Sequence, residues 1–388
     1  MSEQRKSPVR VLAYADSAIC SGAESFFAGT VAGVAGDPAF DLEFAAPAAN
    51  AELTALLENA AGRPAAADVP VQPLPLAALH LLDPRRRRAA GAALAGLDPD
   101  VVLLNLPSAE YGSTPLTLGG LRDTPIVGLV HITGSMRELG FRLGRIRAHI
   151  ARRLLSRLDR ACVLSRAAAR RFPQLWGSRD PDPAVIRMPR PGLAPVDRGE
   201  ARRNLGLEAA GPLVGIGGRV TALQKGHDTL VAASRLIVRR RPEVGFVVAG
   251  EGRDRAAIER MVDRRGLSAN WHFVGQVSPI ADFLSAVDAI AIPSRFEGLP
   301  LIALEALEVG LPGIASAVDG LNDVWPPEWL VGPDDPEALA EGLLEVLGAG
   351  RDVNAAPLAE GRRLMEGRVT DDPSADVRAV LAGAVGGA

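Results

Sequence analysis

Lysine is nearly absent from this chain of 388 residues, although basic residues as a class are not. Only Lys6 and Lys225 occur among 43 basic side chains, and the rest are arginine. Such usage, with abundant alanine and glycine, is typical of a G+C-rich bacterial genome in which interchangeable lysines have been replaced. Lys225 is therefore a candidate for a role that arginine cannot fill, such as a compact ammonium directed at a phosphate. Chance survival of one lysine is the alternative.

Cysteine and long apolar runs are also scarce, and the net charge is small. Each of these features argues against a class of protein. Two cysteines are too few for a disulfide framework and indicate a reducing compartment, so we expect a cytoplasmic protein. No apolar run reaches the roughly 20 residues that span a bilayer, and we expect no secretory signal because the first ten residues lack an apolar segment. A net charge of −3 argues against a partner such as nucleic acid.

The rest of the composition, 47% apolar and 23% charged, is that of a globular protein long enough for two domains. The first half alternates apolar strands with helices. Strands are expected at residues 9–14, 42–46, 69–74, 100–106, 125–131 and 161–165. Near-continuous apolar runs are typical of parallel strands covered on both faces, so we expect an α/β fold with doubly wound sheets.

A second alternating pattern follows a proline- and glycine-rich stretch at residues 188–200, which we interpret as the linker between domains. Its strands are expected at residues 213–218, 245–252, 271–274, 287–293 and 313–316. We therefore divide the chain into a first domain at residues 1–190, a second domain at residues 191–372 and a terminal helix at residues 373–388.

The most informative stretch is AIPSRFEGLPLIALEALEVGLPGIAS, at residues 291–316. Pro300 at the first helical position and Gly310 after the last one predict a short helix between two strands. No side chain caps its start, so the amides of Gly298 and Leu299 are available to an oxygen-rich or anionic ligand. Glu297 lies directly before these amides.

Glu305 lies inside the same helix among apolar residues, with no ion-pair partner at the usual helical spacing. Because an unpaired carboxylate is costly to bury, Glu305 needs a partner from elsewhere. Glu297 and Glu305 near one helix start suit the hydroxyl groups of a sugar. The alternative is an exposed glutamate on an ordinary βα unit.

A glycine-rich turn follows the first strand of the second domain and carries two cations. Residues 213–218 end in two glycines, and Arg219 and Lys225 come next. Glycine lets a backbone approach a ligand closely, and ligands of parallel sheets bind at the carboxyl ends of the strands. The retained lysine therefore lies where an anion is expected to bind.

The sequence EGLPLIALE resembles the signature of the retaining nucleotide-sugar glycosyltransferases of family 4. These enzymes have the GT-B fold, in which two doubly wound Rossmann-like domains face each other across a cleft and a C-terminal helix crosses back to the first domain. The resemblance implies that Glu297 contacts the donor sugar together with the amides of Gly298 and Leu299. It also implies that Glu305 holds the ribose.

Other loops resemble the same family. Arg219 and Lys225 match its diphosphate-binding pair beside Gly218, and the loop with Val277 matches the segment that receives the nucleobase. Gly22 lies in SGAE, which resembles the family's GGAE element facing the donor diphosphate or the acceptor, although a turn with a helix cap explains it as well. His131 ends a strand, as does the family histidine that reaches the donor sugar; a structural role is the alternative.

By this resemblance the chain is a hexosyltransferase that moves a sugar, most commonly from a UDP-sugar, to an acceptor hydroxyl with retained configuration. Catalytic roles then fall on Arg219, Lys225, Glu297 and His131, without a cofactor or metal. Two alternatives stay open. One is a nucleotide-sugar 2-epimerase of the GT-B fold, and the other is a non-catalytic protein that binds nucleotides or glycans. No motif specifies the acceptor.

Two further patterns have simpler explanations. Asp98-Pro99-Asp100 and Asp180-Pro181-Asp182 resemble metal-binding DxD motifs, but both contain proline at turns, so turn chemistry explains them and no metal site is expected. Between Arg145 and Arg160 the apolar residues fall on one stripe of a helix with a basic face. Such a helix can contact an anionic membrane peripherally, although a solvated basic face is the favoured alternative.

Overall fold

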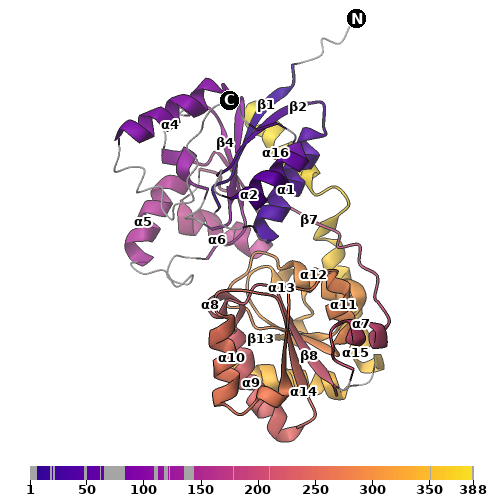
Figure 1. The fold of residues 1–388 in the computed structure, drawn as a ribbon. Helices are drawn as coiled ribbons and strands as arrows, with labels where there is room; N and C mark the ends of the chain where they lie inside the picture. The colour runs from indigo at the N-terminus through magenta and orange to yellow at the C-terminus, as the bar shows by residue number, and fades with distance from the viewer. Residues whose placement is uncertain are drawn as a thin grey trace, which may run out of the picture. The chain divides into compact units, whose positions relative to one another are not determined.

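The computed structural model describes residues 7–17, 20, 22–47, 50–61, 63–64, 84–108, 112–117, 121, 123–134, 144–177, 179–208, 210–349 and 351–386. The chain divides into two compact units, each with its own parallel sheet (Figure 1). The first unit is Met1–Pro189 with Thr370–Ala388, and the second is Arg190–Val369. The strand predicted at residues 69–74 lies outside the described residues.

The described part of the first unit contains a six-stranded sheet in the order β2-β1-β3-β4-β5-β6, with every neighbouring pair parallel. Apolar residues fill both faces of its central strands, and every residue of β3 is buried. The strands are β1 (Val9–Tyr14), β2 (Phe40–Ala45), β3 (Val101–Leu106), β4 (Ile126–Val130), β5 (Arg160–Val163) and β6 (Ala184–Val185). β1 has the bounds predicted for it, and the later ends shift by one or two residues.

Helices cover both faces of this sheet, and α6 shows how local sequence sets their ends (Figure 1). The Ser165 hydroxyl accepts a hydrogen bond from the Ala168 amide at its start, and Gly177 ends it in the left-handed conformation. The described helices are α1 (Gly22–Ala35), α2 (Ala51–Ala61), α4 (Pro84–Gly96), α5 (Gly144–Leu155) and α6 (Arg166–Trp176), with the short 3-10 helix η1 (Thr114–Thr117).

The second unit repeats the architecture with a six-stranded parallel sheet in the order β10-β9-β8-β11-β12-β13 among its described residues. Its strands are β8 (Leu213–Gly217), β9 (Gly245–Ala249), β10 (Trp271–Gly275), β11 (Ala289–Ile292), β12 (Gly313–Ser316) and β13 (Leu330–Val331). Its helices are α7 (Arg198–Asn204), α8 (Ala222–Lys225), α9 (His227–Arg240), α10 (Arg255–Arg264), α11 (Ile280–Ala286), α12 (Leu301–Val309), α13 (Leu321–Val324), α14 (Pro336–Gly348) and α15 (Arg351–Glu366), with the 3-10 turns η3 (Ser268–Asn270) and η4 (Pro327–Trp329).

The chain leaves the first unit after β7 (Met188–Pro189) and re-enters it within β14 (Val369–Thr370), and these two strands pair with each other. The terminal helix α16 (Ser374–Gly386) then belongs to the first unit, with Val377 and Leu381 fully buried. This return of the last helix confirms the expectation drawn from the GT-B resemblance.

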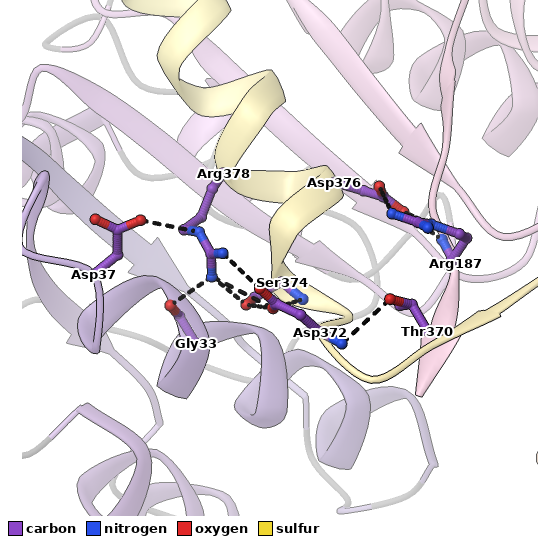
Figure 2. Close-up of polar contacts among 8 residues, drawn as sticks. All are labelled: Gly33, Asp37, Arg187, Thr370, Asp372, Ser374, Asp376 and Arg378. Carbon is purple, nitrogen blue, oxygen red and sulfur yellow. Dashed lines mark hydrogen bonds and ion pairs between the residues drawn. The ribbon is translucent and has the colours of Figure 1, made fainter. Parts of the chain in front are cut away.

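Polar contacts fix α16 in place, as Figure 2 shows. The guanidinium of Arg187 donates to both carboxylate oxygens of Asp376, at 3.0 and 2.8 Å. Arg378 donates to the carbonyl of Gly33 at 3.0 Å and pairs with Asp372 at 2.6 Å and Asp37 at 3.1 Å. The last helix therefore joins α1 and the segment before β7 within one unit.

Candidate functional site

The site in the second unit lies at the edge where strand order reverses. β8 has β9 on one side and β11 on the other, so consecutive strands run outward from β8 in one direction and from β11 in the other. Ligands of open parallel sheets bind outside the carboxyl ends of the strands at such a switch point. The loops that leave β8 and β11 carry the predicted cations and the predicted Glu297, respectively.

Lys225 and Glu297 are in direct contact at this edge. The Nζ atom of Lys225 lies 2.6 Å from Oε1 of Glu297, and the Ser294 hydroxyl donates to the same oxygen at 2.7 Å. Their side chains are only 16% and 6% exposed, so water screens the pair weakly. Two residues that the sequence assigned to different parts of a donor therefore share one ion pair in the free protein.

Gly226 explains how the lysine turn comes so close to the end of β11. It adopts a φ of +66°, and a Cβ atom there would lie 2.0 Å from the carbonyl oxygen of Pro293. Only glycine fits both the left-handed conformation and the contact. The turn formed by α8 is thus packed directly against the strand end that leads to Glu297.

The backbone of Gly218 lies close to the ammonium of Lys225. A Cβ atom built on Gly218 would lie 3.9 Å from Nζ of Lys225, which places the two residues side by side. Gly218 is itself exposed, and so is Arg219 after it. The Arg219 side chain makes no hydrogen bond or ion pair with the described part of the chain, so its guanidinium is available to an anion.

α12 begins one residue later than predicted, because Pro300 is the residue before the helix, with an extended ψ of 126°, and Leu301 is the first helical one. No side chain caps this end, as expected. The amides of Gly298 and Leu299 donate no hydrogen bond to any described residue. Gly320 packs closely against this segment, since a Cβ atom on Gly320 would lie 1.9 Å from the carbonyl oxygen of Gly298.

Glu305 lies on α12 one turn after Leu301 and has no hydrogen bond or ion pair with the described residues. Burial, with a smaller contribution from Glu308, raises the pKa of Glu305 from 4.5 to about 7. The surroundings of Glu305 therefore disfavour the charged form of its carboxyl group.

Val277 lies in the loop after β10 and is half-buried. This loop joins the rest of the site through backbone contacts at Gly250, whose amide donates to the Gly275 carbonyl at 2.7 Å. A Cβ atom on Gly250 would lie 2.0 Å from the Gly218 carbonyl, so the loops after β8, β9 and β10 pack backbone against backbone.

Gly22 and His131 lie in the first unit, whereas the other predicted site residues lie in the second. Gly22 is the exposed first residue of α1. His131 follows β4, is buried, and its Nε2 atom lies 2.8 Å from Oδ1 of Asn105. Burial lowers the pKa of His131 to about 3, so the ring is neutral, and the amide oxygen of Asn105 requires the proton on Nε2.

Sequence reasoning missed a buried polar group at the end of β1 in the same unit. Asp16 accepts hydrogen bonds from the Gly112 amide at 2.5 Å and the Thr114 hydroxyl at 3.0 Å. Burial raises the pKa of Asp16 to about 6. The signal was present, because an acid directly after a buried parallel strand lies at the edge where ligands bind.

The two DxD patterns have other partners. Asp98 and Asp100 both pair with Arg10, at 2.7 and 3.0 Å, and Asp180 accepts from the Ala161 amide at 3.0 Å. No group of three or more histidine, cysteine or acidic side chains among the described residues could hold a metal ion.

The predicted basic helix is α5, whose Ala151, Leu154 and Leu155 are buried and whose Ile146 is 60% exposed. None of the described helices has the length and apolar character needed to cross a bilayer. Peripheral contact of α5 with a membrane stays a prediction.

Two family models match the chain, one in each unit. The model described as "Glycosyl transferase 4-like domain" matches residues 21–189, and the model described as "Glycosyl transferases group 1" matches residues 211–349. The chain belongs to the family 4-like glycosyltransferases. The resemblance seen in EGLPLIALE is thereby confirmed at the level of the family.

Curated relatives of this family member match it over part of their length. It is 34% identical to the lipopolysaccharide core biosynthesis mannosyltransferase LpsB of Rhizobium meliloti over 135 residues, which are 34% of this chain and 38% of LpsB. It is 27% identical to the D-inositol 3-phosphate glycosyltransferase of Segniliparus rotundus over 288 residues, which are 67% of this chain and 62% of the relative. The matches thus span less than two thirds of each relative.

A solved structure shares the whole fold. The Anabaena protein HepE, crystallised in complex with UDP and glucose, superposes with a TM-score of 0.76 at 18% identity, and the alignment covers 96% of this chain and 99% of HepE. The likeness, with the two parallel-sheet units, establishes that this family member has the GT-B fold.

The raised pKa of Glu305 predicts a pH-dependent effect of Glu305→Gln on stability. Between pH 4.5 and 7 the folded protein retains a proton that the unfolded chain releases, so the stability falls as the pH rises through this window. Glutamine removes that penalty. We expect its melting temperature to exceed the wild-type value by roughly 2–4 °C at pH 8, the shift that about 1 kcal/mol produces in a domain of this size.

At pH 5 the difference should largely vanish, because Glu305 is then neutral in the folded protein. Glu345→Gln, an exposed change on α14, is the control and should shift the melting temperature by the same small amount at both pH values. Differential scanning fluorimetry measures all three proteins. An equal gain for Glu305→Gln at pH 5 and pH 8 contradicts the assignment.

Proposed function

We propose that this family member is a retaining glycosyltransferase that moves a hexosyl group from a nucleotide diphosphate sugar, specifically a UDP-sugar, to an acceptor hydroxyl. The observation that carries the proposal is the contact of Lys225 with Glu297 over the Gly218 backbone, at the carboxyl edge of the second sheet. The names of its relatives, a mannosyltransferase and an inositol phosphate glycosyltransferase, support a transferase. UDP and glucose in the HepE complex support the donor.

The donor's diphosphate lies against Arg219, Lys225 and the exposed backbone of Gly218. Arg219 is the unpaired cation and Lys225 the paired one, so the diphosphate competes with Glu297 for the lysine ammonium. The diphosphate draws the Lys225 ammonium partly away from Glu297. The sugar hydroxyls then donate hydrogen bonds to the Glu297 carboxylate in its place. The unsatisfied amides of Gly298 and Leu299 face an oxygen of the sugar, as helix starts commonly do for oxygen-rich ligands.

The ribose and the base occupy the outer part of the same edge. Two ribose hydroxyls donate to Glu305, which supplies the partner that the free protein lacks, and donor binding lowers the pKa of this carboxyl. The base lies against the backbone of the loop with Val277. These contacts bind the nucleotide without taking part in the reaction.

In the reaction the bond between the anomeric carbon and the diphosphate oxygen breaks, and a bond from the acceptor oxygen to the same carbon forms on the same face. The acceptor proton passes to a diphosphate oxygen. Arg219 and Lys225 stabilise the negative charge that develops on the leaving diphosphate, a contribution of about 3 kcal/mol for one well-placed donor. Because two cations perform this task, we propose that no metal or cofactor is needed. His131, neutral and fixed by Asn105, is proposed to contact the sugar.

Lys225→Ala should lower kcat by roughly 100-fold while the donor KM changes less than about tenfold, because the charge it stabilises develops mainly in the transition state. Thermal-shift screening against UDP, GDP and their sugars first identifies the donor. Release of nucleotide diphosphate on addition of candidate acceptors then measures turnover. Arg240→Ala, an exposed change on α9, is the control.

Three results of that assay would contradict the proposal. Conversion of the donor sugar to its 2-epimer without an acceptor would make the protein an isomerase. Donor binding without turnover on any acceptor would make it a binding protein. Equal losses of kcat/KM and affinity in Lys225→Ala would mean that the lysine binds ground state and transition state alike.

Glu297→Gln should tighten the binding of UDP alone by about tenfold, because it frees the Lys225 ammonium and removes a negative charge beside the diphosphate site. The same variant should lose turnover, since the amide cannot accept both sugar hydroxyls as the carboxylate does. Ser294→Ala is the matched control, because it removes a hydrogen bond to Glu297 and leaves the charge. Isothermal titration with UDP measures both; weaker UDP binding by Glu297→Gln argues against competition for the lysine.

A further inference from the structure

Arg295 lies two residues before Glu297, in the loop between β11 and α12, and contacts the turn that carries Lys225. Its backbone amide donates to the Gln224 carbonyl at 2.8 Å, and its Nη1 atom donates to the Ala222 carbonyl at 2.6 Å. Both carbonyls belong to α8, the helix that ends at Lys225. One arginine thus joins the two segments whose side chains form the ion pair.

Two acidic residues hold the guanidinium of Arg295 in this position. Asp228, in the first turn of α9, receives both Nη atoms in a two-point contact at 3.0 and 2.8 Å. Asp334, in the loop before α14, accepts from Nε at 2.6 Å. Arg295 is 22% exposed, Asp228 34% and Asp334 58%. The contact with Asp228 is therefore the stronger one, because it is bidentate and less exposed to water.

The side-chain contacts of Arg295 use none of the groups assigned to the donor. Arg295 donates to the Ala222 carbonyl, Asp228, Asp334 and Thr229, and none of these is a residue assigned to the donor. The five N–H donors of the Arg295 guanidinium are therefore directed at groups of the protein itself. Its effect on a ligand must pass through Glu297 and Lys225.

We propose that Arg295 is a positioning residue, which with Asp228 forms a clamp that holds the Glu297 loop and the Lys225 turn at one fixed separation. The ion pair of Lys225 and Glu297 needs both segments in register, since its oxygen and nitrogen lie 2.6 Å apart. When the free protein already holds the site in its productive geometry, less of the ligand's binding energy is needed to order the site. The consequence for the donor rests on the proposed function, whereas the clamp itself does not.

The clamp is tested without any ligand by amide hydrogen exchange of the full chain. Within residues 222–226 and 294–299, Arg295→Ala should speed exchange by about tenfold or more at the hydrogen-bonded amides of Ala222, Lys225, Gly226 and residue 295, because both segments lose their common anchor. The amides of β8 and β11 should keep their protection. Asp228→Asn should give the same local pattern, and Arg295→Lys, which keeps the charge and loses the fork, should be intermediate. Unchanged exchange in both segments, or a uniform increase across the unit, overturns the clamp.

Arg240→Ala is the matched control for this experiment. Arg240 pairs with Glu341 and so also joins α9 to α14, but both side chains are more than half exposed and lie away from the two loops. It should leave the exchange of residues 222–226 and 294–299 unchanged. An equal increase in this variant would mean that any bridge between α9 and α14 has the effect, and the specific role of Arg295 would be lost.

The positioning role is tested by comparing the affinities for UDP and for UDP-glucose. Arg295→Ala should weaken UDP-glucose relative to UDP by about tenfold, because both ligands lose the ordered Lys225 turn but only UDP-glucose also loses the ordered Glu297 loop. The double variant Arg295→Ala, Asp228→Asn should match Arg295→Ala alone, since the two residues act as one unit. Additive losses, or equal losses for both ligands, overturn the positioning role. A wild-type protein that binds neither ligand contradicts the proposed donor, and hydrogen exchange alone then decides the clamp.

Discussion

The ion pair between Lys225 and Glu297 is the contact on which the rest of the site depends. It lies at the point where strand order reverses, and its two side chains are mostly removed from water. Breaking one partner there would leave a poorly solvated charge, so the free protein keeps the pair closed. A ligand can separate the pair if its anionic part binds the Lys225 ammonium and its hydroxyl groups donate to the Glu297 carboxylate. A nucleotide diphosphate sugar has both parts.

Close backbone packing makes that contact possible. Gly226 meets the Pro293 carbonyl, Gly250 meets the Gly218 carbonyl, and Gly320 meets the Gly298 carbonyl, each at a distance that no Cβ atom tolerates. The loops after four neighbouring strands are thus held by sterics, and the Arg295 contacts add directional bonds to two of them. The backbone of such a site is already in place before a ligand binds, which favours electrostatic stabilisation by preorganised groups.

The sequence predicted the fold and the segments of the site better than the contacts between them. β1 and β12 have their predicted bounds because buried parallel strands are continuous apolar runs, and α12 differs by one residue because Pro300 keeps an extended ψ. The contact of Lys225 with Glu297 spans 72 residues and depends on β8 and β11 being neighbours, which no local pattern encodes. Asp16 was missed, although it follows a buried parallel strand, because its partners Gly112 and Thr114 lie far from it in the sequence.

Nuclear magnetic resonance of the lysine ammonium groups tests the central claim most directly, because the chain has only Lys6 and Lys225. In protein labelled with nitrogen-15 lysine, Lys225→Arg assigns the Lys225 signal by its loss. The account predicts a distinct signal in the free protein that moves in Glu297→Gln and moves again when UDP is added to the wild type. A Lys225 signal that stays unchanged at UDP concentrations that raise the melting temperature would contradict it.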